Sequence, residues 1–136
     1  MKQNLNQKNK RGYTLMEIMV VVIVVGILAS IALPRYSFTM ERAKSAEGLE
    51  ILGSVSQAQK VYQIENGNYT TNLANLDVTF DTIQYFNAPS VFDPLDPVAN
   101  PIASIQRSSG LYTFSINENG TITCSGDPTA CSKLGY

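Results

Sequence analysis

Apolar and polar positions divide the chain into an almost purely apolar N-terminal stretch and a mixed remainder. From Tyr13 to Leu33 the only charged residue is Glu17. A helix rises about 1.5 Å per residue, so a run of about 20 residues crosses the hydrocarbon core of a bilayer. The pattern therefore predicts a membrane-spanning helix that carries one acid near its start.

Basic residues gather before the apolar stretch, since four lie among the first twelve residues and no acid does. A basic flank holds that side of a membrane helix in the cytoplasm, so the rest of the chain should face outward. A secretory signal has the same basic start, but its apolar region is usually only about 7–15 residues long. Here Pro34 and Arg35 follow and a helical pattern continues. A signal peptide is disfavoured, and a plain single-pass anchor leaves Glu17 unexplained; both stay open.

The helical pattern continues beyond the membrane stretch, from Arg35 to about Asn66. Ile51, Val55, Ala58 and Tyr62 recur at spacings of four, three and four, which places them on one face of a helix. The Asn-Gly-Asn sequence at 66–68 supplies a stop, because its glycine suits the left-handed conformation that follows many helices.

Strand patterns follow in the last third of the chain. The clearest is Leu111–Ile116, with alternating apolar residues, a turn at 117–120 and a return strand at Thr121–Cys124. Weaker candidates are Thr82–Asn87 and Ile102–Arg107. We expect an α+β fold in which a long N-terminal helix packs on a three- or four-stranded antiparallel sheet.

Composition excludes several classes of function. The chain has ten basic and eleven acidic residues, and removing the first twelve residues leaves six basic ones against the same eleven acids. Such an acidic surface gives no footprint for nucleic acid. There is no histidine and no glycine-rich phosphate loop, although a Ser–Lys pair stays open. We therefore expect no enzyme and no cofactor.

The two cysteines, Cys124 and Cys131, enclose six residues. In an exported domain we expect them to form a disulfide. A metal site would need more ligands, and redox pairs usually have two intervening residues. Further upstream, Asp93 and Asp96 each precede a proline; they fit turns, and calcium binding stays open as the less favoured alternative.

The hexapeptide Gly12-Tyr13-Thr14-Leu15-Met16-Glu17 resembles the processing site of type IV prepilins and the related pseudopilins. The resemblance implies cleavage after Gly12 by a prepilin peptidase and N-methylation of Tyr13, where the family usually has phenylalanine. It also implies three parts: a cytoplasmic leader (1–12), a membrane or filament-core helix (13–34) and an exported head (35–136). Pro34 corresponds to the family's helix-breaking proline, so we expect a kink there.

Glu17 corresponds to the family's acid at the fifth mature position. An acid at the centre of a spanning helix costs on the order of 2.5–3.5 kcal/mol, and less near an end, so Glu17 needs a partner. Cleavage would expose an amine on Tyr13, and the family precedent pairs the acid with that amine on a neighbouring copy. The alternative is that Glu17 merely reaches the lipid headgroups.

The resemblance implies a structural subunit of a type IV pilus, serving adhesion, twitching motility or DNA uptake. The alternatives are a major-type pseudopilin of a type II secretion system and an uncleaved anchored binding domain. The cysteine loop and the absence of tryptophan favour the pilin. The expected partners are other copies of the chain, the peptidase and methyltransferase, the pilus assembly machinery and the inner membrane. After assembly the protein would lie in an extracellular pilus or a periplasmic pseudopilus.

Overall fold

The computed structural model describes residues 12–94 and 101–136. The chain forms two compact units, one ending at Ser37 and one beginning at Phe38. Helix α1, Leu15–Asn66, contributes residues to both units, and everything after Asn66 belongs to the second. Each unit is described by itself, and the second is called the head.

Helix α1 ends where the sequence predicts. The Gly67 N–H donates to the Gln63 carbonyl at 2.8 Å, and Gly67 has a φ of 83°, in the left-handed region. The Asn66 side chain donates to the Tyr62 carbonyl at 3.0 Å, which satisfies one of the last carbonyls of the helix. Pro34 lies inside the helix.

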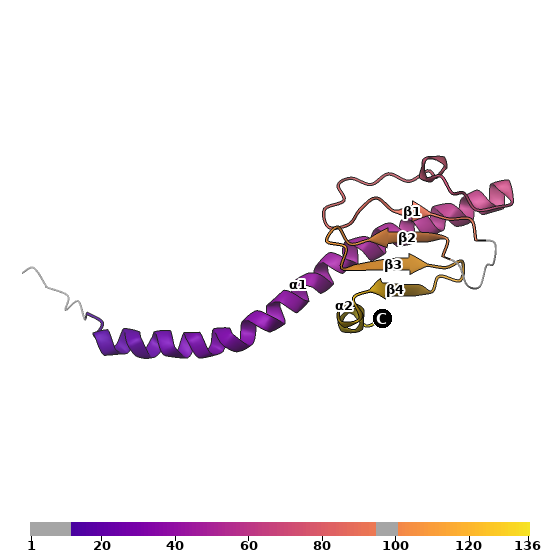
Figure 1. The fold of residues 1–136 in the computed structure, drawn as a ribbon. Coiled ribbons are helices and arrows are strands. Elements are labelled where there is room, and N and C mark those ends of the chain that lie inside the picture. Colours follow the sequence, from indigo (N-terminus) through magenta and orange to yellow (C-terminus); the bar gives the residue numbers. More distant parts are fainter. Residues whose placement is uncertain (1–11, 95–100) are drawn as a thin grey trace, which may run out of the picture. The chain divides into compact units, whose positions relative to one another are not determined.

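The head contains one antiparallel sheet with the strand order β1-β2-β3-β4 (Figure 1). Its strands are β1 (Ser90–Val91), β2 (Ala103–Gln106), β3 (Tyr112–Ile116) and β4 (Ile122–Gly126). Neighbours in the sheet are also neighbours in sequence, as in a simple meander. The expected α+β fold, a long N-terminal helix with a small antiparallel sheet, is therefore confirmed.

The expected strand at Thr82–Asn87 is wrong. Only Phe86 makes an isolated bridge, to Arg107, and the first strand lies at Ser90–Val91 instead. The reason is a side chain: the Glu47 carboxylate accepts the N–H groups of Gln84 and Tyr85 at 2.7 and 2.9 Å. Donors that bind a helix side chain are not available to a neighbouring strand.

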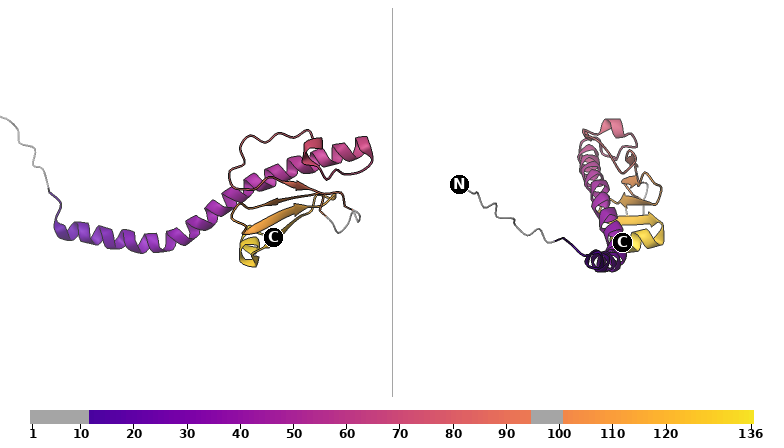
Figure 2. Two further views of the ribbon diagram at one scale, coloured as in Figure 1. Left: turned by 45° about the horizontal axis from the view of Figure 1, so that its top comes forward. Right: turned by 90° about the vertical axis from the view of Figure 1, so that its left-hand side faces the viewer.

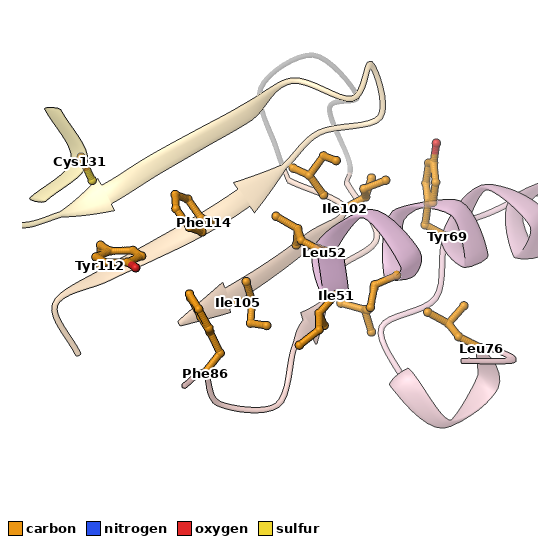
Figure 3. Close-up of a cluster of buried hydrophobic side chains, with 14 residues drawn as sticks. Ile51, Leu52, Tyr69, Leu76, Phe86, Ile102, Ile105, Tyr112, Phe114 and Cys131 are labelled. Carbon is orange, nitrogen blue, oxygen red and sulfur yellow. The ribbon is translucent and has the colours of Figure 1, made fainter. Parts of the chain in front are cut away.

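A single core lies between the head part of α1 and the sheet (Figure 3). Along β3, Tyr112, Phe114 and Ile116 are buried, and the two residues between them are half-buried. The rings of Tyr112 and Phe114 lie 5.0 Å apart, and Phe86 stacks on Phe114 at 6.3 Å. These aromatic side chains supply much of the apolar area that stabilises a domain of this size.

The buried face of α1 is rotated from the expected one. Ile51 and Val55 are buried as predicted, but Ala58 and Tyr62 are only half-buried. The buried residues of α1 also include Gly48, where an added Cβ atom would lie 2.6 Å from the Phe86 ring. The helix therefore approaches Phe86 through a residue that has no side chain.

Gln59 is a polar side chain with no exposed area in the middle of this core. Its amide nitrogen donates to the carbonyls of Thr70 and Ile102 at 2.8 and 3.1 Å, and to that of Phe92 at 3.3 Å. Its amide oxygen accepts the Thr70 N–H at 3.0 Å. One side chain thereby satisfies backbone groups of three segments far apart in sequence.

A short C-terminal helix, α2 (Pro128–Leu134), was not expected from the sequence. Asp127 caps it by accepting the N–H groups of Thr129 and Ala130, and Gly135 ends it with a φ of 99°. A disulfide joins Cys124 of β4 to Cys131 of α2, with a Cα–Cα distance of 5.7 Å. The expected disulfide is confirmed, and it connects this helix to the sheet.

We expect Gln59→Leu to destabilise the head by about 2–4 kcal/mol, because it leaves several buried backbone groups without a partner. Thermal unfolding of the full chain in mild detergent measures the loss. Gln57→Leu is the matched control, since Gln57 is exposed on the same helix and should change stability by only about 0.5 kcal/mol. Equal effects of the two substitutions would contradict the role given to Gln59.

Candidate processing and assembly site

The first turn of α1 brings the predicted N-terminal site residues together. Gly12, Tyr13 and Thr14 precede the helix in exposed, non-helical backbone. A protease needs such an accessible, non-helical peptide bond, and the bond after Gly12 has this character. Residues 1–11, which hold the rest of the expected leader, lie outside the described residues.

Thr14 caps α1, and Glu17 lies three residues further on. The Glu17 N–H donates to the Thr14 hydroxyl and carbonyl oxygens, both at 3.2 Å. A threonine followed three residues later by glutamate is the spacing of a capping box. The carboxylate also lies in the first turn, where the helix dipole favours negative charge. The position of Glu17 therefore suits the start of the helix as well as any role between subunits.

The apolar part of α1 exposes its side chains over its whole length. The described residues contain one helix long and apolar enough to cross a membrane, and its most apolar window has a mean hydropathy of 2.7 with none of its residues buried. Ile23, for example, is 62% exposed and Leu33 is 67% exposed. A surface of this size requires lipid or other protein to cover it.

Glu17 has no ion-pair partner within the described part of the chain, where both salt bridges involve Glu41. No cation of the same copy compensates the acid within these described residues.

Pro34 lies further along the same helix. It has no N–H to donate to the carbonyl four residues earlier, which weakens the helix locally. The Ser37 hydroxyl donates to the Pro34 carbonyl at 3.0 Å. A kink at Pro34 remains a prediction.

A second polar cluster, which the sequence did not reveal, lies at the start of the head. The Glu41 carboxylate accepts hydrogen bonds from Arg107 Nε at 2.7 Å and from the Tyr112 hydroxyl at 3.1 Å. The guanidinium also donates to the Tyr85 carbonyl. Arg107 is only 8% exposed, so its charge depends on this pairing. The cluster joins the beginning of the helix in the head to the β2–β3 turn.

The charges in this cluster shift one another's protonation. The hydrogen bond from Arg107 lowers the pKa of Glu41 below its ordinary value of 4.5, against the opposing effect of burial. Burial, together with the hydrogen bond to Glu41, raises the pKa of Tyr112 to about 12. Glu41 therefore stays ionised and Tyr112 protonated over the whole neutral range.

The calcium alternative gains no support from the described residues. Asp93 is exposed, and no group of three potential metal ligands occurs in residues 12–94 and 101–136. Asp96 lies outside the described residues.

Comparison with known proteins places these features in a family. A family model described as the prokaryotic N-terminal methylation motif matches residues 7–33. The chain is 33% identical over 69 residues to the type IV wide pilus major component PilA4 of Thermus thermophilus, covering 51% of this chain and 53% of that protein. These matches support assignment to the type IV pilin family in the broad sense, which includes pilins and type II secretion pseudopilins.

Other relatives of this pilin-like chain fall into two groups. It is 27% identical over 105 residues to the type II secretion system core protein G of Aeromonas hydrophila, covering 71% of this chain and 73% of that protein. The type IV major pilin protein PilE1 of Neisseria gonorrhoeae is 27% identical over 111 residues, covering 82% of this chain and 55% of that protein. The chain spans about half the length of most of the curated relatives it matches. No solved structure matches it significantly.

These matches establish a pilin-like structural subunit and agree with the expectation that the protein is not an enzyme. They fit membrane anchoring and a filament built from many subunits. Because pilins and type II secretion proteins both appear among the relatives, the comparison does not decide between them.

The Glu41 cluster predicts an acid-sensitive contribution to stability. Since the pKa of Glu41 is lowered by folding, its contribution is present above the ordinary value of 4.5 and is lost as the pH falls through the lower folded value. Glu41→Gln should therefore be less stable than the wild type at about pH 7, and the gap should shrink towards about pH 3.

Melting temperatures of the full chain in detergent across this range test the prediction. The control is Glu65→Gln, at an exposed acid of the same helix that makes no ion pair in the described residues. A gap between Glu41→Gln and the wild type that stays constant with pH would contradict the assignment.

Proposed function

We propose that the protein is a structural subunit of a type IV pilus, matured by cleavage after Gly12 and N-methylation of Tyr13. One observation carries the proposal: an exposed apolar helix, whose single acid has no ion-pair partner among residues 12–94 and 101–136, begins at Leu15, shortly after an accessible Gly12–Tyr13 bond. Before assembly the helix lies in the inner membrane, and afterwards it lies in the core of the fibre. On this proposal residues 1–12 are the leader, 13–34 the membrane or core helix, and 35–136 the exported head.

An ion pair at Glu17 would fix the axial position of each subunit relative to the next. Cleavage frees the amine of Tyr13, and a terminal amine has an ordinary pKa of about 7.7–8.0 and is mostly cationic at neutral pH. Opposite charges about 4 Å apart attract by roughly 4 kcal/mol at an effective dielectric of 20, before the cost of desolvation. The carboxylate of one copy pairs with the amine of the next, so that otherwise featureless apolar helices do not slide along one another.

The C-terminal region supports the pilus over the pseudopilus. Major pseudopilins resemble this chain in the helix, but they usually have a tryptophan-containing, calcium-binding C-terminal segment and no terminal disulfide. Here a disulfide holds α2 on β4, and the sequence has no tryptophan. The second candidate, a pseudopilin of a type II secretion system, is favoured by the similarity to core protein G, which covers most of both chains.

Electron microscopy of cells that make the protein, with antibody against the head, distinguishes these candidates. We expect labelled filaments on the cell surface. Protein recovered from them should have lost residues 1–12 and gained one methyl group, as read by intact mass. Periplasmic protein without surface filaments would favour the pseudopilus, and solitary chains that retain the leader would favour the anchored binding domain.

Substitutions at Glu17 separate its charge from its capping role. Glutamine also satisfies a capping box, so Glu17→Gln keeps the helix start and removes only the charge. We expect both Glu17→Gln and Glu17→Ala to yield processed protein that does not assemble, as measured by sheared filament yield and intact mass.

Thr14→Ala is the matched control for capping, because it removes the hydroxyl that accepts the Glu17 N–H. It should weaken the start of the helix without removing the charge, so filaments should persist. Normal filaments from Glu17→Gln together with none from Thr14→Ala would show that capping, not charge, is what assembly requires.

A further inference from the structure

A groove runs along the head part of α1 beside its buried stripe, and the buried Ile51 forms part of the lining. The chain that follows α1 returns alongside the helix, as Figures 1 and 2 show. Three hollows between the helix and this returning segment share lining residues, Ser54 and Thr79 for one pair and Ala58, Val61 and Asp77 for the other. They therefore form one continuous groove, which we call the acidic groove.

The acidic groove combines apolar contact area with negative charge. Val61 is 55% exposed although it is aliphatic, and the half-buried Ala58 lies beside it. No basic residue lines the three hollows. The lining acids come from both walls: Glu47, Glu50 and Glu65 from α1, and Asp77 and Asp81 from the returning segment.

A different face of the same helix carries positive charge. At about 100° per residue, Arg42, Ala46, Gly53 and Lys60 fall on one line, roughly a third of the way round α1 from the centre of the groove. We call this line the basic stripe. Arg42, Ala46 and Lys60 are exposed. In the described part of the chain no carboxylate pairs with Arg42 or Lys60; Arg42 lies over the Phe38 ring at 5.4 Å.

The small residues of the stripe leave room for a close neighbour. A Cβ atom at Gly53 would meet nothing within 4 Å. Glycine weakens a helix, and the packing of the head would accept a larger residue at this position. Between the two cations the helix surface is therefore low at Gly53, where an added side chain would meet no atom of the same head.

The spacing of charges on the two faces matches. Arg42 and Lys60 are separated by 18 residues, and so are Glu47 and Glu65, which is about 27 Å along the helix in each case. Two parallel copies displaced by five residues, about 7.5 Å, place Arg42 level with Glu47 and Lys60 level with Glu65. A single displacement therefore places a carboxylate of one copy opposite each of the two cations of the other.

We propose that the acidic groove of one head receives the basic stripe of a second copy, side by side and parallel with this displacement. The two faces differ, so the contact is heterologous: the copy that offers its groove keeps a free stripe, and the copy that inserts its stripe keeps a free groove. A heterologous contact with an axial displacement does not close into a ring but continues as a helical fibre. The inference rests on the proposed filament, and it names the surface through which the heads join.

A charge swap at one end of the interface tests the proposal in the full chain, expressed with the assembly machinery. Lys60→Glu and Glu65→Lys should each lower the yield of sheared filaments about tenfold, because each places like charges opposite one another. The double variant Lys60→Glu/Glu65→Lys should restore the yield. Lys133→Glu, a reversal at an exposed lysine of α2, should have no effect.

A steric variant probes the same contact without changing charge. Gly53→Gln meets no atom of its own head and favours the helix, so the monomer should be at least as stable, whereas filament yield should fall. Wild-type yields from either single reversal, or a double variant as defective as the singles, would overturn the interface. Failure of the wild-type chain to assemble would instead contradict the proposed function, and the interface with it.

Discussion

The protein depends on a surface that a single copy cannot satisfy. The apolar part of α1 exposes almost every side chain, and the one acid within it has no cation near it in the described chain. Lipid can cover the aliphatic surface but gives poor solvation to a carboxylate. Neighbouring copies can cover the surface and supply a terminal amine, so the proposed filament satisfies both needs at once.

The head is small, and it is held together by contacts between residues far apart in sequence. Among the described residues, a core of fourteen buried apolar side chains joins the helix to the sheet, and two polar side chains with several hydrogen bonds, Gln59 and Glu41, fix their relation. Gln59 satisfies backbone groups around the start of β2, and Glu41 holds Arg107 at its far end. Each of these two side chains gives buried polar groups the hydrogen-bond partners that water would otherwise supply, because an unsatisfied polar group in such a core would be costly. The disulfide adds a covalent tie for the last short helix.

Local features were the ones that the sequence predicted well. The apolar run, the end of α1 before Gly67 and the strands on either side of the 117–120 turn each depend on neighbouring residues. The Glu41–Arg107 pair joins residues 66 positions apart, and no short-range pattern indicates it. The same holds for Glu47, which takes the backbone donors of Gln84 and Tyr85 and so prevents the strand expected there. Helix α2 is different, because Asp127, Pro128 and Gly135 are standard helix-boundary residues, yet the sequence pattern was not interpreted as a helix.

The position of Glu41 has a mechanical consequence. In the proposed fibre, tension would pass through each subunit along α1, and Glu41 is among the first residues of the head on that path. Its bonds to Arg107, which follows β2, and to Tyr112 of β3 join the helix directly to the sheet, so part of the load would pass to the strands at this point. Protonating this one carboxylate in acid would remove that sharing, and the force at which a head yields would then depend on the acidity of its surroundings.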